Sequence, residues 1–261
     1  MESEALTAGW AWMLGNLSEF QITTVATFVL HELFYWAAYV PFLVADRVPA
    51  MRRWKIQPDK ESNAATQWQC FRRVMLSHMF IVAPLVALTH FVKGGFPMSL
   101  PLPPWQTSVF QVIAMFVIED FFFYWGHRLL HTPWLYRNIH SIHHEFSSPI
   151  GMAAEYAHPA EVVFLGIATG IGPLVFGPHL FTLWCYLCVR CFQTVECHSG
   201  YDFPWSLNRW VPVYGGADFH DHHHKNYSGN YASTFIWMDA VYGTDAAYQQ
   251  WKAKQTANKA S

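Results

Sequence analysis

The sequence predicts an all-α integral membrane protein with about three spanning helices, a broken helical hairpin and a cytosolic histidine-rich cap that holds a dimetal site. Three observations favour this fold class. Of the 261 residues, 52% are hydrophobic and only 13% are charged, whereas soluble domains carry about 25% charged residues. Several apolar stretches approach the ~20 residues that a spanning helix needs. Eight of the fifteen histidines fall into three tight clusters.

The composition also excludes some classes of protein. The net charge of −2, without a long basic run or a nucleic-acid motif, argues against a nucleic-acid partner. Five cysteines, an odd number, do not form a disulfide framework and favour a reducing compartment. We find neither a Pro/Gly/Ser-rich linker nor an internal repeat. We therefore expect one membrane-embedded domain over residues 1–261, with membrane helices in about 1–108 and the catalytic histidine region in about 109–244.

Three apolar stretches are candidate spanning helices, roughly Gln21–Ala45, Val74–Val92 and Val109–Gly126. Each contains ionisable residues, which at that depth usually face a protein interior or a polar site; these are His31, Glu32, His78, Glu119 and Asp120. A very apolar soluble helical protein is the alternative.

Charged residues in the connecting segments predict the orientation. The first connection is basic, and it carries Arg47, Arg52, Arg53, Lys55, Lys60, Arg72 and Arg73. The second connection is Pro-rich and has a single lysine. The positive-inside rule places the first connection in the cytosol and the second across the membrane. The end of the third stretch, at His127, then returns to the cytosol.

A fourth apolar stretch, Ala160–Cys197, is long enough to cross twice. Gly and Pro residues near its middle predict a turn between two short helices; they are Gly170, Gly172, Pro173, Gly177 and Pro178. This hairpin requires the residues before Ala160 and after Cys197 to lie on one side. The more polar, turn-rich segment after Cys197 is expected to belong to a cytosolic cap.

The histidine clusters have the spacing of metal ligands. They are His127 with His131, then His140, His143 and His144, then His220, His223 and His224. Spacings of three and four residues place side chains on one helix face. Imidazole binds iron, zinc, copper and nickel, and eight ligands exceed the three or four of a single zinc site. We therefore expect two metals. Isolated histidines such as His31, His78, His90 and His179 are expected to be packed or hydrogen-bonded side chains.

These clusters resemble the histidine boxes of the fatty acid hydroxylase/sterol desaturase superfamily, and within it the methylsterol monooxygenases, or sterol 4-methyl oxidases. The resemblance runs from about Val109 to Thr244. Besides the boxes, it rests on four segments, namely 119–124 (EDFFFY), 154–161 (AEYAHPAE), 198–205 (HSGYDFPW) and 215–220 (GGADFH).

The resemblance implies a centre of two iron ions, O2 as co-substrate, and electrons from NAD(P)H through a b-type cytochrome or its reductase. It implies a lipid substrate, a sterol, whose 4-methyl group is oxidised stepwise to alcohol, aldehyde and acid, and a separate sterol decarboxylase downstream. It also implies a multi-pass protein of the endoplasmic reticulum membrane, with boxes facing the cytosol. An unactivated methyl C–H bond needs such a cofactor, because acid–base side chains alone cannot oxidise it.

Carried over residue by residue, the resemblance gives nine metal ligands, which are His127, His131, His140, His143, His144, His198, His220, His223 and His224. Three further residues are candidates to touch or orient a ligand. Asp120 precedes His127 by two helical turns, and carboxylates commonly orient metal-bound imidazoles. His158 recurs in the family motif. Asp202 stands where relatives can carry histidine, and is a ligand, an orienting partner or neither.

Three other readings compete with sterol 4-methyl oxidation. A fatty-acyl or other lipid hydroxylase or desaturase would use the same boxes, but the segments around His158 and His198 favour the sterol enzyme. A non-catalytic membrane metal-binding protein or transporter would have polar residues tracking across the bilayer. A structural protein that has lost activity would be expected to have lost a box ligand.

Overall fold

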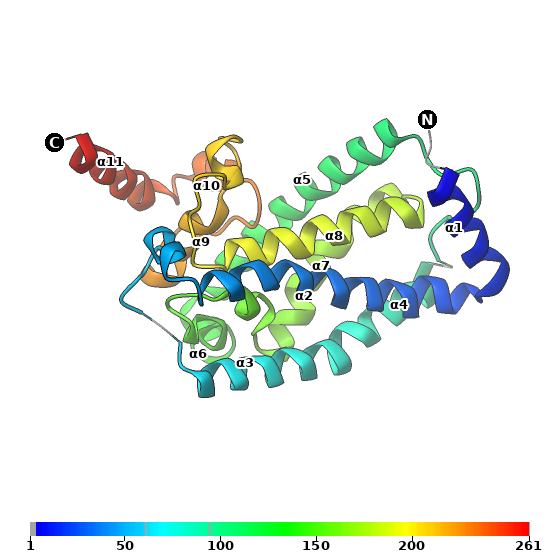
Figure 1. Ribbon diagram of the computed structural model, residues 1–261, viewed down its shortest axis with the longest axis horizontal. Coiled ribbons are helices and arrows are strands. Elements are labelled where there is room, and N and C mark those ends of the chain that lie inside the picture. Colours follow the sequence, from blue (N-terminus) through cyan, green and yellow to red (C-terminus); the bar gives the residue numbers. More distant parts are fainter. Residues whose placement is uncertain (1–3, 61, 94, 261) are drawn as a thin grey trace.

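The computed structural model describes residues 4–60, 62–93 and 95–260, which form helices and two isolated β-bridges (Figure 1). The α-helices are α1 Glu4–Asn16, α2 Thr27–Ala45, α3 Ala64–Ser77, α4 Ala83–Lys93, α5 Trp105–Leu130, α6 Pro133–Asn138, α7 Pro159–Phe176, α8 Leu180–Cys197, α9 Gly216–Asn226, α10 Trp237–Tyr242 and α11 Ala246–Ala260. Two π-helical segments, η1 Gln21–Ala26 and η3 His78–Val82, lead into α2 and α4. Short 3-10 helices are η2 Pro49–Trp54, η4 His140–Glu145, η5 Gly151–Glu155 and η6 Leu207–Arg209.

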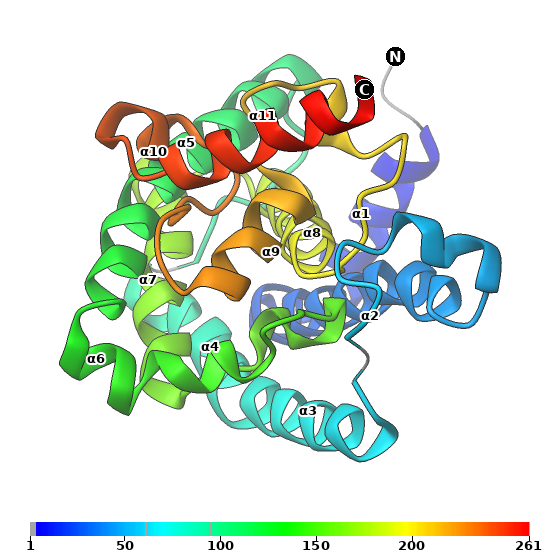
Figure 2. The same ribbon diagram turned by 90° about the vertical axis from the view of Figure 1, so that its left-hand side faces the viewer.

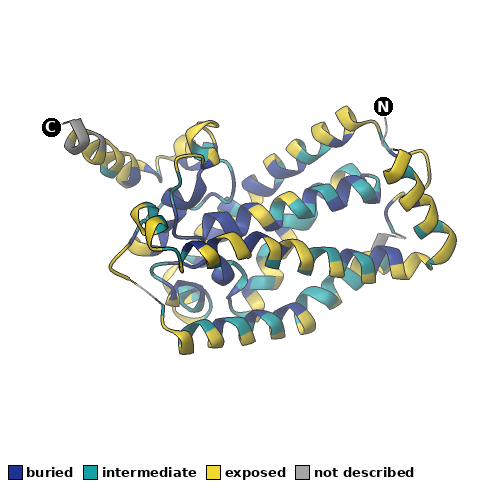
Figure 3. Ribbon diagram, viewed as in Figure 1, coloured by how far each residue is buried: buried dark blue, intermediate teal, exposed yellow. Residues whose placement is uncertain are grey.

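Four continuous helices are long and apolar enough to cross a membrane, namely Gln21–Ala45, Ala64–Phe91, Trp105–Leu130 and Pro159–Phe176. Figure 3 shows many exposed positions along these helices, and a large share of them carry large apolar side chains. Leu33, Phe80, Phe110 and Val175 are each more than 60% exposed, which a lipid environment tolerates and water does not. The chain is therefore a multi-pass membrane protein, and the predicted fold class is confirmed. The second span begins earlier than expected, so Arg72 and Arg73 lie in α3 instead of the connection.

Ionisable residues inside the spans face the protein interior, as expected. Glu119 and Asp120 on α5 are both fully buried. Glu119 accepts hydrogen bonds from Arg190 Nε at 2.6 Å and from the Tyr186 hydroxyl at 3.1 Å, both on α8. This intramembrane ion pair links α5 to α8.

Helices α7 and α8 form the expected hairpin. Gly177 ends α7 with φ of 53°, a left-handed conformation that glycine adopts without strain. The ring of His179 then caps α8 by accepting a hydrogen bond from the N–H of Phe181. Gly170 and Pro173, which the sequence suggested as part of the break, lie within α7 instead. A Cβ at Gly172 would lie 2.9 Å from Met115 Cα, so this glycine allows α7 to approach α5 closely.

The hairpin returns the chain to the end of the molecule where α6, η4 and α9 lie, opposite α1 (Figures 1 and 2). The basic connection before α3 packs against the same end. The N–H of Ile56 donates to the carbonyl of Gly200 at 2.9 Å, and Gln57 Nε2 donates to Asp221 at 2.9 Å. The residues before Ala160 and after Cys197 therefore share one side with the basic connection, as the hairpin requires.

Candidate metal centre

The structure brings all nine histidines named from the sequence together at this end of the helices. His127 lies in the last turn of α5 and His131 immediately follows that helix. The second box forms the 3-10 helix η4, and His198 immediately follows α8. The third box lies on α9, which is bounded by Gly216 and the left-handed residue Tyr227. The side chains are buried, except that of His131, which is partly exposed.

The nine histidines separate into two groups, within each of which the ligand atoms lie within 4.8 Å of one another. The five-histidine group consists of His127, His131, His140, His144 and His223. The four-histidine group consists of His143, His198, His220 and His224. Helices η4 and α9 each supply residues to both groups. Residues three and four positions apart along a helix share one face but point in slightly different directions, so they can reach neighbouring sites. Two neighbouring metal positions follow from this division.

Hydrogen bonds at Nδ1 fix which ring nitrogen carries the proton in most of these residues. Backbone carbonyl oxygens, which can only accept, lie 2.6–3.1 Å from the Nδ1 atoms of His127, His143, His198, His223 and His224. Each Nδ1 must therefore carry the hydrogen, and each neutral ring presents a lone pair at Nε2.

The Nε2 atoms face one another at short distances. His220 Nε2 lies 2.9 Å from His198 Nε2, and His223 Nε2 lies 3.2 Å from both His131 and His144. Lone pairs this close repel each other unless a cation lies between them. Two nitrogens about 2.1 Å from one ion lie about 3 Å apart when the angle between them is near 90°. The donor set therefore fits two metal ions bound through imidazole Nε2 atoms.

Burial keeps these imidazoles neutral at physiological pH. It lowers the pKa of His143 to about 4, although the bond to the Tyr156 carbonyl acts in the opposite direction. Burial, followed by the neighbouring His127, lowers the pKa of His131 to about 2. Metal binding requires unprotonated rings, so both residues are ready to act as ligands without first losing a proton.

Among the described residues, one carboxylate forms a hydrogen bond with a box histidine, and it was not a candidate from the sequence. His140 Nδ1 donates to Glu161 Oε1 at 2.7 Å, and both side chains are almost completely buried. A carboxylate behind a metal-bound imidazole fixes the ring and raises its basicity. The sequence feature that could have identified Glu161 is its position three residues after His158, in the first turn of an apolar helix.

His158 acts one step further from the centre. Its Nδ1 accepts a hydrogen bond from the N–H of Ala160 at 3.1 Å, which caps the N-terminus of α7. This cap helps to fix the first turn of α7, from which Glu161 reaches His140. His158 lies outside both histidine groups.

Asp120 does not orient a ligand imidazole directly, which corrects the expectation from its spacing. Its two carboxylate oxygens accept hydrogen bonds from the N–H groups of Thr234 and Phe235, at 2.8 and 2.9 Å. The acceptor for His127 Nδ1 is the carbonyl of Tyr231, at 2.8 Å. Asp120 therefore holds the segment that carries this acceptor. The helical spacing placed it on the correct face, but a backbone segment occupies that face.

Asp202 also lies outside both groups, where it pairs with Arg209 at 2.5 Å. Its backbone N–H donates to the carbonyl of Trp54, in the basic connection. Asp202 therefore connects two segments of the cap.

A cavity of about 350 Å³ extends from the centre into the membrane-spanning region, within the range of small-molecule sites. Five of the nine histidines line it, namely His127, His140, His143, His198 and His220. Most of the remaining wall is apolar and comes from η3, α4, α5, α7 and α8, with residues such as Val82, Leu85, Phe123, Leu165 and Leu187. The cavity therefore offers an apolar ligand access to the centre.

Comparison with known proteins identifies the family. Residues 112–244, about half of the chain and all of the histidine boxes, match the fatty acid hydroxylase family. The chain belongs to this family. It is 49% identical to a very-long-chain aldehyde decarbonylase of Oryza sativa subsp. indica, over 97% of both chains. It is 46% identical to methylsterol monooxygenase 2-2 of Arabidopsis thaliana, over 94% of both chains. Methylsterol monooxygenase 2-1 of the same plant is 43% identical, over 94% of this chain and 96% of that protein. No solved structure matches the chain.

Family membership and the names of these relatives support an oxidoreductase that acts on a lipid. The names differ in the reaction, since some relatives are monooxygenases and others are decarbonylases.

Proposed function

We propose that this chain is a membrane-bound di-iron monooxygenase that oxidises the 4-methyl group of a sterol intermediate stepwise to alcohol, aldehyde and acid. The observation that carries the proposal is the cavity, which joins an apolar interior between the spanning helices to five of the nine histidines. A lipid in this cavity can place one carbon at the centre while its apolar body remains out of water.

The nine histidines would hold two iron ions, which when bound supply the one-electron chemistry with O2 that an unactivated C–H bond requires. The protein's own residues perform the remaining tasks. Backbone carbonyls orient the imidazoles, and Glu161 orients His140. The apolar walls exclude water and restrict the substrate to positions near the centre.

The orientation and the partners follow from the same proposal. The basic connection packs beside the box region, so the positive-inside rule would place the centre at the cytosolic face of the endoplasmic reticulum membrane. A b-type cytochrome or its reductase would then deliver electrons originating from NAD(P)H from the cytosol. A sterol decarboxylase would remove the acid product. Protease protection in sealed microsomes, with a tag on α11, tests the orientation: a tag sheltered inside the vesicles would contradict it.

The reaction is tested by rescue of cells that lack sterol 4-methyl oxidase, with sterols measured by mass spectrometry. We expect demethylated sterols to reappear with the wild-type chain and to be lost again with His143→Ala. Continued accumulation of 4-methylsterols at normal expression would reject the sterol reaction.

Aldehyde decarbonylation is the second candidate, because the relative in Oryza sativa subsp. indica carries that name at 49% identity. Its product is a hydrocarbon one carbon shorter than the aldehyde. Membranes containing the chain should be supplied in parallel with a labelled very-long-chain aldehyde and a labelled 4-methylsterol. Hydrocarbon formed without any sterol acid would favour this candidate, whereas sterol acid alone supports the proposal above.

A further inference from the structure

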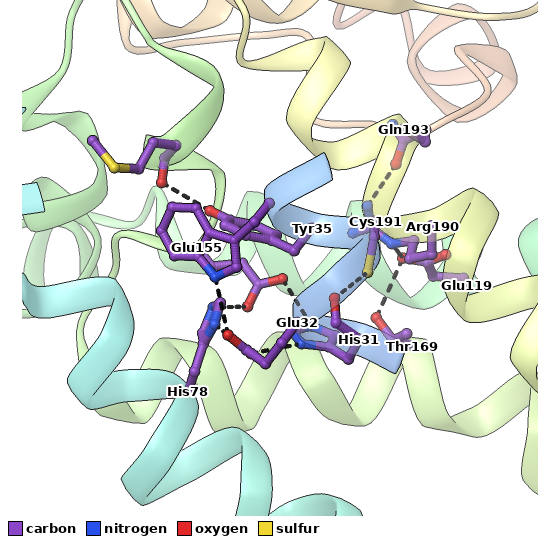
Figure 4. A network of polar contacts seen from close by, with 12 residues as sticks. His31, Glu32, Tyr35, His78, Glu119, Glu155, Thr169, Arg190, Cys191 and Gln193 are labelled. Atoms are coloured by element: carbon purple, nitrogen blue, oxygen red, sulfur yellow. Dashed lines mark hydrogen bonds and ion pairs between the residues drawn. The ribbon is translucent and has the colours of Figure 1, made fainter. Parts of the chain in front are cut away.

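A second histidine cluster lies apart from the nine histidines, and Figure 4 shows it from close by. It consists of His31 and Glu32 on α2, His78 at the start of the π-helix η3, and Glu155 at the end of η5; we name these four residues the His–Glu quartet. His78 is completely buried, and the other three side chains are between 12% and 22% exposed. His31 and Glu155 line the cavity that leads to the centre.

The two imidazoles of the quartet have the same orientation toward its two carboxylates. Both Nδ1 atoms face Glu32 Oε1, at 3.2 Å from His31 and 2.7 Å from His78. Both Nε2 atoms face Glu155, at 3.4 Å from His31 and 2.9 Å from His78. Glu32 is further fixed by the indole of Trp36, whose Nε1 donates to Oε2 at 3.0 Å.

This is the arrangement of metal-bound histidines with a carboxylate behind them. An ionised Glu155 only accepts, so it favours a hydrogen on each Nε2 and leaves a lone pair on each Nδ1. In a neutral imidazole those lone pairs face a carboxylate oxygen, an arrangement that a cation bound between them would stabilise. One ligand atom each from His31, Glu32 and His78 lies within 4.8 Å of the other two.

His78 lies between the two carboxylates. Both of its ring nitrogens are buried, and carboxylate oxygens lie 2.7 Å from Nδ1 and 2.9 Å from Nε2. At these distances the Nδ1 lone pair and the oxygen of Glu32 can be neighbouring ligands of one ion.

The charges of the quartet also match one divalent ion. Two buried carboxylates require compensating charge, and a divalent cation with two neutral imidazoles supplies it. Two imidazolium rings would also supply it, but they would place two positive charges on rings whose centroids are 5.2 Å apart. Two imidazole nitrogens and a carboxylate oxygen are suitable ligands for Zn²⁺ and Fe²⁺.

We propose that His31, His78 and Glu32 bind a third, mononuclear divalent transition-metal ion, and that Glu155 orients both imidazoles from behind. The ion joins α2, η3 and η5. The residue that follows η5, Tyr156, supplies the carbonyl that accepts from His143 Nδ1. The third ion thereby fixes the segment that orients a box histidine, and its binding does not depend on which lipid the enzyme oxidises.

The test is a metal count on the purified full-length chain. Protein stripped with a chelator, reloaded with Zn²⁺ and freed of excess by gel filtration is analysed by inductively coupled plasma mass spectrometry. We expect three zinc ions per chain in the wild type and two in His78→Ala. His90→Ala is the matched control, because His90 lies in the same span and its Nδ1 lies 2.8 Å from the hydroxyl of Thr23, away from the quartet; it should retain three.

One result would overturn the proposal, namely a zinc count in His78→Ala equal to that of the wild type. If His78→Ala does not fold, Glu32→Gln keeps the shape of the side chain and removes its charge, and it should also lose one ion. The comparison uses the difference between variant and wild type, so it remains valid if the nine-histidine centre loads incompletely. It also remains valid if the sterol reaction is rejected.

Discussion

The nine-histidine centre and the His–Glu quartet are both buried, but their ring nitrogens face different partners. In the centre, Nε2 atoms face other Nε2 atoms, and the Nδ1 atoms mostly face neutral backbone carbonyls. In the quartet, every ring nitrogen faces a carboxylate oxygen. Neutral ligands leave most of a metal's positive charge available for chemistry, whereas two carboxylates neutralise a divalent ion. The comparison separates a centre suited to reaction from a site suited to holding segments together.

The largest effect is expected from removing a ligand of the centre. His143→Ala, in the four-histidine group, or His223→Ala, in the five-histidine group, should lower turnover more than ~100-fold and reduce bound iron, because an Nε2 ligand is lost and the remaining lone pairs are left uncompensated. Sterol oxidation and iron content in isolated membranes measure both effects, and membrane insertion should be unchanged.

The matched control for this change is His222→Ala. His222 lies on the same helix, α9, between two ligands, but it belongs to neither group and packs against Tyr248 and Trp251. It should retain iron and activity. Full activity and normal iron content in His143→Ala or His223→Ala would remove the ligand assignment.

The next largest effect should follow from changing the one carboxylate that touches a centre histidine among the described residues. Glu161→Gln keeps an acceptor for His140 Nδ1 but removes the negative charge, and loss of such an orienting carboxylate typically costs about 10–100-fold in metal affinity or activity. Glu161→Ala, which removes the acceptor as well, should be worse. The iron retained during stepwise chelation measures whether the wild type, Glu161→Gln and Glu161→Ala lose iron in this order of increasing ease. Equal retention in wild type, Gln and Ala variants would show that the charge behind His140 is unimportant.

The two histidine sites also show what a sequence can and cannot reveal. Eight of the nine histidines were recognisable because their spacing of three and four residues repeats along the chain, whereas His198 was assigned only through the family resemblance. The quartet was not recognisable, because its residues at positions 31, 32, 78 and 155 meet only after α2, η3 and η5 have packed. His31 and His78 therefore looked like isolated core histidines. The division of the nine into groups of five and four was equally hidden, since it depends on how η4 and α9 face each other.

The spanning helices were predictable to within a few residues at most ends, because apolar length determines them. The positions at which these helices end or break were less predictable. Pro173 looked like a helix break but lies inside α7, whereas Gly177 is the residue that ends the helix. The ion pair of Glu119 with Arg190 required the α5–α8 contact, which sequence spacing does not contain. Packing between segments that are distant along the chain therefore could not be predicted from the sequence.

A smaller effect is expected from Asp120→Asn. An amide has one acceptor oxygen, so one of the two N–H groups at Thr234 and Phe235 would face an NH2 donor. An unsatisfied buried group costs about 1–3 kcal/mol, and the strain should reach Tyr231 and, through its carbonyl, His127. Thermal unfolding should shift downward, with a modest decrease in iron affinity. A variant with wild-type stability but no bound iron would instead indicate that Asp120 acts directly on the centre.

The smallest effect is expected from His158→Ala, which separates the cap of α7 from the carboxylate that the helix carries. Loss of an N-cap side chain typically costs ~1 kcal/mol, so the unfolding temperature should fall slightly. Glu161 should remain against His140, because burial of both side chains holds that contact. His158→Asn restores a side-chain acceptor at the cap and should recover the stability. The decisive reading is the iron content, which should equal that of the wild type in both variants. A loss of one iron in His158→Ala that asparagine does not restore would make His158 a ligand and would enlarge the centre to ten histidines.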